Sequence, residues 1–139
     1  MSRKSGLSSQ ISGAVVSAAI LLAVSMSMPA FAGDVTKEVS TAAEHAGYAA
    51  DATLITTAYS HLHHTINCLV GPLSASFDAK EANPCAAMGS GAIPDTTDAT
   101  KAKNLKAALK KAKAGLASKD LATAKTNAAA AQALLKKAM

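Results

Sequence analysis

Apolar side chains recur in alternating steps of three and four residues through the middle of the chain, a spacing typical of a helix that buries one face. This seam consists of His45, Tyr48, Ala52, Ile55, Tyr59, Leu62, Ile66 and Leu69. Gly71 and Pro72 follow it, and both residue types favour the end of a helix. The pattern predicts one long helix that ends near Val70. A break near Gly47 into two helices is the alternative, because glycine costs about 1 kcal/mol inside a helix.

The same spacing returns in the last forty or so residues, now built mainly from alanine and leucine. Its positions are Ala102, Leu105, Leu109, Ala112 and Leu116, followed by Leu121, Ala124, Ala128, Ala131, Leu135 and Ala138. A short connection between two such segments predicts an antiparallel helical hairpin over residues 98–139. Residues 71–97 are rich in glycine and proline, so we expect a loop there.

Residues that favour helix starts precede each segment. Asp34 or Thr41 is expected to open the first helix, Asp95 or Asp98 the second, and Ser118 the third. The sequence therefore predicts an all-α protein, a small bundle of three or four helices. It would combine a long N-terminal helix or helix pair over 33–70, a disulfide-tied loop and the C-terminal hairpin in a single domain over 33–139.

The first 32 residues have the features of a signal peptide. Arg3 and Lys4 precede an uncharged apolar run over 11–28, and Pro29 and the small residues up to Ala32 form an A-x-A cleavage site. Cleavage near Ala32 predicts a periplasmic or secreted protein. The apolar run is also close to the length of a membrane span, so an uncleaved anchor is the alternative.

Two cysteines, Cys68 and Cys85, remain after this cleavage. In an oxidising compartment one intramolecular disulfide is the expected state, which would tie the loop to the end of the first helix. If the thiols were instead reduced, Cys68 could bind a metal directly, and the preferred ion would be a softer one.

Charge is distributed unevenly along the chain. Residues 33–100 carry a net charge of −6, whereas residues 101–139 carry ten lysines against Asp120 alone, a balance of +9. Either the lysines are solvated and face an acidic first helix, or the hairpin contacts an anionic surface. The region after residue 32 contains no arginine and few aromatic residues, which argues against nucleic-acid binding.

Three of the four histidines fall within four consecutive positions, at His61, His63 and His64. On a helix, His61, His64 and Cys68 lie within about 60° of one another, and His63 lies on the opposite flank. On a straight helix His45 would be roughly 27 Å from His63, so it could not join the same site.

The pair His61 and His64 forms a half-site for Cu, Ni or Zn. A further ligand would come from the loop, from Asp78, Glu81 or Met88. We therefore predict a metal site at His61, His64, His63 and Met88, in which His63 matters least.

Other interpretations of the histidines remain open. The cluster near the helix end could cap the carbonyls before Gly71 and interact with the helix dipole. His45 on the seam is expected to be buried or interfacial. A non-covalent haem held by His63 or His64 with Met88 is disfavoured because aromatic residues are scarce.

Histidines placed along alanine-rich helices, over 45–68 with the hairpin 105–137, resemble small periplasmic metal-binding bundles. That resemblance implies a helical metal-binding protein, although the hairpin of this chain lacks histidine. The block His61 to Cys68, followed by Asn83-Pro84-Cys85, is similar to a family of uncharacterised exported proteins, which implies no particular activity.

No motif for covalent haem, for a zinc protease or for a phosphate-binding loop occurs in the sequence. We therefore expect a non-enzymatic exported protein that buffers or carries a transition metal. The alternative is a structural module that self-associates, for example as a homodimer, or that binds a partner protein, with structural histidines.

Overall fold

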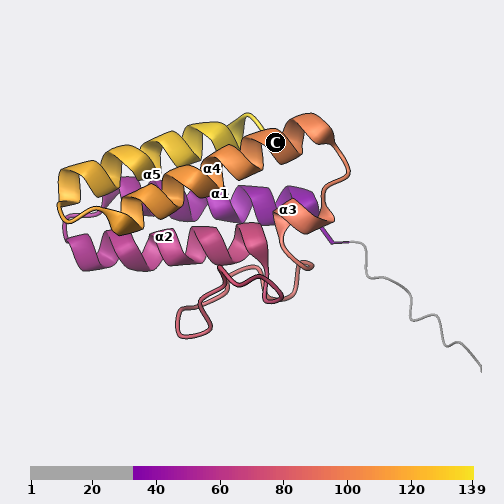
Figure 1. Ribbon diagram of the computed structural model, residues 1–139, viewed down its shortest axis with the longest axis horizontal. Coiled ribbons are helices and arrows are strands. Elements are labelled where there is room, and N and C mark those ends of the chain that lie inside the picture. Colours follow the sequence, from indigo (N-terminus) through magenta and orange to yellow (C-terminus); the bar gives the residue numbers. More distant parts are fainter. Residues whose placement is uncertain (1–32) are drawn as a thin grey trace, which may run out of the picture.

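The computed structural model describes residues 33–139, which contain four long helices and one short helix (Figure 1). They are α1 (Val35–Asp51), α2 (Ile55–Val70), α3 (Ala92–Asp95), α4 (Ala99–Ala117) and α5 (Leu121–Lys136). No strand occurs among these residues, so the predicted small all-α bundle is confirmed. The expected signal peptide, residues 1–32, lies outside the described residues.

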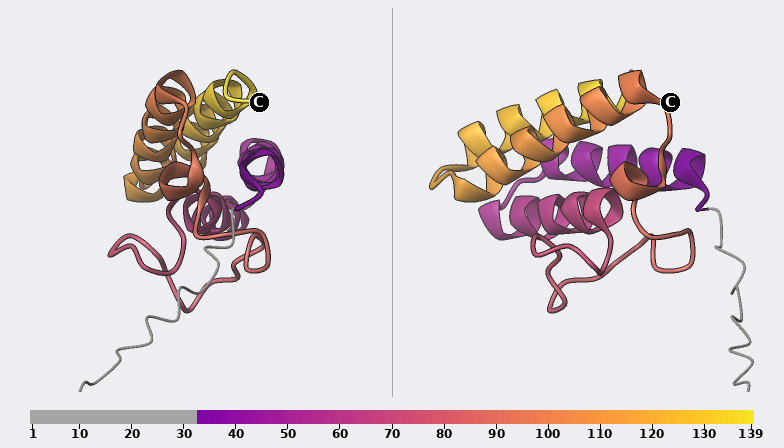
Figure 2. Two further views of the ribbon diagram at one scale, coloured as in Figure 1. Left: turned by 90° about the vertical axis from the view of Figure 1, so that its right-hand side faces the viewer. Right: turned by 45° about the vertical axis from the view of Figure 1, so that its right-hand side comes forward.

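The four long helices form two antiparallel hairpins that pack on each other. Helix α1 lies against α2 and α5, and α4 lies against α2 and α5, so each long helix has two main neighbours. Figures 1 and 2 show the α4–α5 hairpin as one layer over the α1–α2 layer, with the loop beneath α2 and with α3 near one end of the bundle. Within the described residues, none of the helices combines the length and apolar character needed to cross a membrane.

The expected single helix up to Val70 is wrong, because the chain folds back between Asp51 and Ile55. The structure instead has the two helices of the alternative interpretation, although the break lies at 52–54, a few residues beyond Gly47. The turn contains no glycine or proline, but Ile55, Thr56 and Thr57 begin α2 with β-branched residues of modest helix propensity. A hairpin lets both halves of the apolar seam bury against each other, whereas a straight helix would leave part of the seam exposed to water.

Side-chain caps define where three of the helices begin. The carboxylate of Asp34 accepts a hydrogen bond from Lys37 N at 3.0 Å, and that of Asp98 accepts from Thr100 N at 2.7 Å. Helix α5 is capped by Asp120 rather than by the expected Ser118. These caps satisfy backbone donors that a helix start leaves without intrahelical partners.

The bundle core is built mostly from alanine, with few large side chains. Leu62, Leu69, Leu105 and Leu135 are the largest fully buried apolar residues. Small residues allow the helices to approach closely, as Gly115 of α4 illustrates: a Cβ there would lie 2.8 Å from Leu62 Cδ1 and 3.3 Å from the backbone oxygen of Ala124. Gly47 lies within α1 and does not interrupt it.

Cys68 and Cys85 form the expected disulfide, with their Cα atoms 5.2 Å apart. Both residues are buried, and the bond joins the last turns of α2 to the middle of the loop. The loop over 71–97 is otherwise irregular, as predicted, apart from the single-turn helix α3.

Most lysines of the hairpin are solvated, as the first of the two charge interpretations expected, and within residues 33–139 none forms an ion pair with a carboxylate of α1. Among the described residues, the lysine ion pair that forms is the one between Lys37 and Asp34, at 3.1 Å. Most hairpin lysines are exposed to solvent. Lys113 instead bonds the hydroxyl of Ser76 at 2.6 Å.

Candidate metal centre

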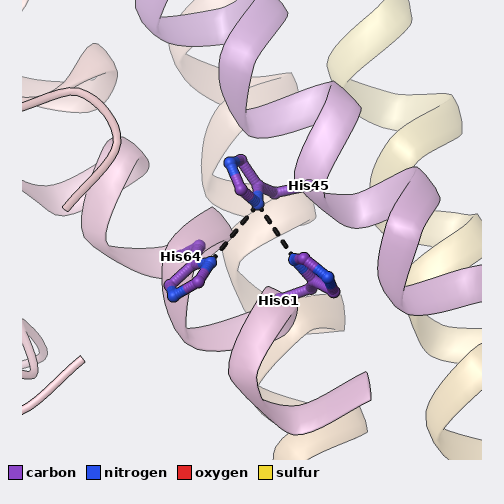
Figure 3. A group of neighbouring side chains, drawn as sticks. All are labelled: His45, His61 and His64. Atoms are coloured by element: carbon purple, nitrogen blue, oxygen red, sulfur yellow. Dashed lines mark hydrogen bonds between the residues drawn. The ribbon is translucent and has the colours of Figure 1, made fainter. Parts of the chain in front are cut away.

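The α1–α2 hairpin brings His45 of α1 against His61 and His64 of α2 (Figure 3). His61 and His64 are one turn apart, so they present their rings from one face of α2. His45 approaches them from the opposite helix because the turn at 52–54 lies midway between positions 45 and 61. The three side chains are half-buried between the two helices.

All three imidazoles direct the same ring nitrogen toward the centre of the group. The Nδ1 atom of His45 lies 3.1 Å from Nδ1 of His61 and 3.4 Å from Nδ1 of His64. One nitrogen from each residue lies within 4.8 Å of the others, so the group could hold a metal ion.

These separations match the geometry of a metal bound to nitrogen. A transition-metal ion lies about 2.0–2.1 Å from an imidazole ligand, so two ligands at the tetrahedral angle are about 3.3 Å apart. The two Nδ1 distances at His45, 3.1 and 3.4 Å, lie on either side of that value. Two of the three separations between ring nitrogens thus already suit a shared ion.

Hydrogen bonding alone satisfies the three nitrogens poorly. A ring nitrogen carries either a proton or one lone pair. If Nδ1 of His45 accepts a hydrogen bond from His61, it has no second lone pair for His64. If it carries the proton, one N–H must be divided between two acceptors. A cation at the centre would satisfy all three lone pairs at once.

Burial favours the neutral rings that metal binding requires. It lowers the pKa of His45, and positive charge on His64 or His61 would lower it further. Burial also lowers the pKa of His64, again with a contribution from His61. Both rings are thus held in the neutral form, which is the form that binds metals.

A carboxylate from the loop faces the outer side of His64. The Nε2 atom of His64 lies 3.8 Å from Glu81 Oε2, which also accepts a hydrogen bond from the hydroxyl of Ser60 at 3.3 Å. An acceptor at this position favours a proton on Nε2 and leaves Nδ1 free to bind a metal. Glu81, expected as a direct ligand, is therefore better placed to orient one.

The loop reaches this position because α2 holds it at two points. The disulfide is one, and the buried side chain of Asn67 is the other. Its amide donates to the carbonyls of Asp78 at 2.9 Å and Ala82 at 3.1 Å, and its Oδ1 accepts from Asp78 N at 2.9 Å. The buried amide thus fixes the backbone that carries Glu81.

His63 and Met88 lie apart from the three histidines. His63 Nδ1 lies 3.4 Å from a carboxylate oxygen of Asp78. The sulfur of Met88 accepts a hydrogen bond from the hydroxyl of Thr41, at 3.8 Å. Neither residue belongs to the nitrogen cluster, which among the described residues is formed by His45, His61 and His64.

Tyr48 covers one flank of the cluster. Its ring centroid lies 5.6 Å from that of His45 and 5.3 Å from that of His61. The residue is 47% exposed, and its hydroxyl donates to Glu44. The cluster is therefore partly shielded but keeps access to solvent for a further ligand.

His45 is the residue that the sequence interpretation missed. The signal that could have found it is the symmetric placement of His45 and His61 about residue 53, which brings the two together if the chain folds back there. Comparison of the chain with protein-family models, with curated proteins and with solved structures gives no match.

Proposed function

We propose that this chain is a non-enzymatic binding protein for a transition metal, with His45, His61 and His64 as its ligands. The observation that carries the proposal is the convergence of three Nδ1 atoms from two helices at distances suited to a shared ion. Three neutral imidazoles suit Zn, Cu or Ni, since each of these metals binds nitrogen ligands readily.

A buffer or carrier role agrees with the partial exposure of the site. Three protein ligands leave at least one coordination position for water or for a donor on another molecule. An ion held in this way can be exchanged without unfolding the bundle. The A-x-A cleavage site and the disulfide support action in the periplasm or outside the cell.

The proposal is tested by calorimetric titration of the protein with Zn(II), Ni(II) and Cu(II). Single substitutions of His45, His61 and His64 by alanine should each weaken binding by about tenfold or more. His63→Ala is the matched control, because it removes a neighbouring histidine outside the cluster, and it should change the affinity less than threefold. His45→Ala is decisive, because a site formed by α2 alone would keep its metal affinity in this variant.

Equal affinity of the wild-type protein and His45→Ala would exclude the three-histidine site. If the wild-type protein binds metal no more tightly than an exposed pair of surface histidines does, the cluster is structural. The protein would then be better described by the second candidate.

The second candidate is an interaction module that uses the lysine-rich hairpin. It is supported by the exposed hairpin lysines, which form no ion pair with a carboxylate within residues 33–139. Self-association through the seam has lost its support, because α1 and α2 now bury that seam against each other. Sedimentation with and without metal separates the candidates, since an interaction module would associate with its partner regardless of metal.

A further inference from the structure

Glu38, in the first turn of α1, is a fully buried carboxylate with only one oxygen satisfied. The residue is 0% exposed, and its Oε1 accepts a hydrogen bond from Gly91 N at 3.0 Å. Its Oε2 has no partner within the part of the chain that the structure describes. A buried carboxylate is stable when charged only if a cation or several donors accompany it.

Gly89 is surrounded by the carboxylates of Glu38 and Asp95 and by the backbone of Gly33. A Cβ at position 89 would lie 2.1 Å from Asp95 Oδ2, 2.7 Å from Gly33 Cα and 2.8 Å from Glu38 Oε1. These atoms therefore surround a single glycine, and only a residue without a side chain fits there.

The nitrogen of Gly33 is close to the carboxylate of Asp95. A Cβ at position 33 would lie 1.8 Å from Asp95 Oδ2. A backbone nitrogen lies about 2.5 Å from the Cβ of its own residue, so Gly33 N is within about 4.3 Å of that oxygen. This is close to ion-pair distance, yet an amide nitrogen carries no charge.

Three acidic side chains, those of Glu38, Asp95 and Asp34, lie close together in this region. Burial, with smaller contributions from the nearby charges of Asp95 and Asp34, raises the pKa of Glu38 to about 7. Asp34 already has Lys37 as its partner. Asp95 accepts a hydrogen bond from Ser90 N at 2.7 Å, but a backbone amide does not neutralise its charge.

We propose that hydrolysis of the Ala32–Gly33 bond by an export-linked protease supplies a cation, as the α-ammonium of Gly33 paired with Asp95 and Glu38. Hydrolysis consumes one water molecule and leaves a carboxylate on Ala32 and an amine on Gly33. The amine takes up a proton, because neighbouring carboxylates favour its charged form. The ion pair then fastens the start of α1 to α3.

This ion pair, which forms only after processing, does not depend on the metal site. It links the expected cleavage sequence Pro29-Ala30-Phe31-Ala32 to the buried carboxylate of Glu38, which lies five residues after Gly33. The folded protein would thus gain its last stabilising contact only after export. Asp34, Glu38 and Asp95 are the charged groups that face the new terminus.

The first test secretes the full chain from a bacterial host and determines the N-terminus by mass spectrometry, which should be Gly33. Two chains that contain the whole described fold are then released from the same fusion partner. One begins at Gly33 and the other retains Ala32. The Gly33 chain should unfold about 5 °C higher, and Asp95→Asn should remove most of this difference. The pKa of the Gly33 amine, measured by NMR, should exceed the ordinary value of 7.7–8.0 by about one unit.

A secreted protein that begins at another residue overturns the assigned cleavage. Equal unfolding temperatures with and without Ala32, or an ordinary pKa for the Gly33 amine, overturn the ion pair. If Ala32 lowers the unfolding temperature equally in Asp95→Asn, the effect is steric and the pairing is refuted. The pKa measurement uses the unsubstituted chain, so it decides the question even if Asp95→Asn fails to fold.

Discussion

His45, His61 and His64 turn the same atom, Nδ1, toward one another, so a bound metal requires the ring proton to sit on Nε2. Of the three, His64 has an acidic group beside its Nε2, the carboxylate of Glu81. The loop thus places a carboxylate 3.8 Å from the outer nitrogen of this ring, where its charge favours a proton on Nε2, and does not supply a ligand to the metal.

Glu81→Gln is predicted to weaken metal binding by about tenfold, because a neutral amide holds the Nε2 proton less strongly. Asp78→Asn is the matched control, since Asp78 faces His63, outside the cluster. Calorimetric titration of both variants is the measurement. A larger loss for Asp78→Asn than for Glu81→Gln would contradict the role given to Glu81.

The metal-free protein is predicted to lose stability as the pH falls below about 6.5. Because the pKa values of His45 and His64 are lowered by folding, the unfolded chain binds protons at these rings before the folded chain does. The free energy of unfolding must then decrease in this range. Thermal unfolding at several pH values, compared between wild type and His45→Gln with His64→Gln, isolates the effect.

That comparison is needed because Glu38 acts in the opposite direction. In the chain that retains Ala32, its pKa is raised from 4.5 to about 7, so this folded chain binds the extra proton between these values. Its contribution to stability falls as the pH rises through that window. A pH dependence that is the same in wild type and the double variant would show that the histidines are not responsible.

At the scale of the elements, the site depends on two helices and on one loop attached to the second helix. The α1–α2 turn sets which residues face each other, and Asn67 holds the loop beside α2 through three hydrogen bonds shorter than 3.2 Å. Buried polar groups of this kind are costly to leave unpaired. The loop is therefore part of the metal centre even though it contributes no nitrogen to it.

Asn67→Ala is predicted to destabilise the protein by about 2–3 kcal/mol, because it leaves buried loop carbonyls without donors. Metal affinity should also fall, by less than in His45→Ala, as Glu81 loses its fixed position. Asn127→Ala is the control: its amide bonds only to Thr123 O within α5, so the change should stay within about 0.5 kcal/mol. Chemical denaturation gives both values, and equal costs would refute the role of Asn67.

At the scale of the whole molecule, the bundle has a thin core and is reinforced by a covalent bond. Alanine dominates the buried positions, and each alanine removes little apolar area from water. The Cys68–Cys85 disulfide closes a segment of 17 residues, which includes much of the loop. Its contribution is thus a large part of the stability of a small domain.

Replacement of Cys68 and Cys85 together by alanine is predicted to cost about 3 kcal/mol, mainly because the unfolded chain gains freedom. Metal affinity should fall only a few-fold, since the three ligands lie on α1 and α2. Denaturation and calorimetry of this variant, beside the oxidised wild type, test both points. Complete loss of binding would mean that the disulfide, and not the helical hairpin, positions the histidines.

Local features of the sequence determined much of this protein. The steps of three and four residues predict the helices, the aspartates at 34 and 98 cap two of them, and the close connection predicts the α4–α5 hairpin. The disulfide follows from two cysteines and an expected oxidising compartment. The neighbouring placement of His61 and His64 follows from the helical repeat alone.

Only the tertiary structure decided that the first apolar seam folds back on itself. No glycine or proline marks the turn at 52–54, because its cause is the burial of distant residues against each other and not a local preference. That long-range gain is what adds His45 to the cluster and leaves Met88 outside it. It also places Glu81, a residue of an irregular loop, beside His64, which no repeat along the chain could indicate.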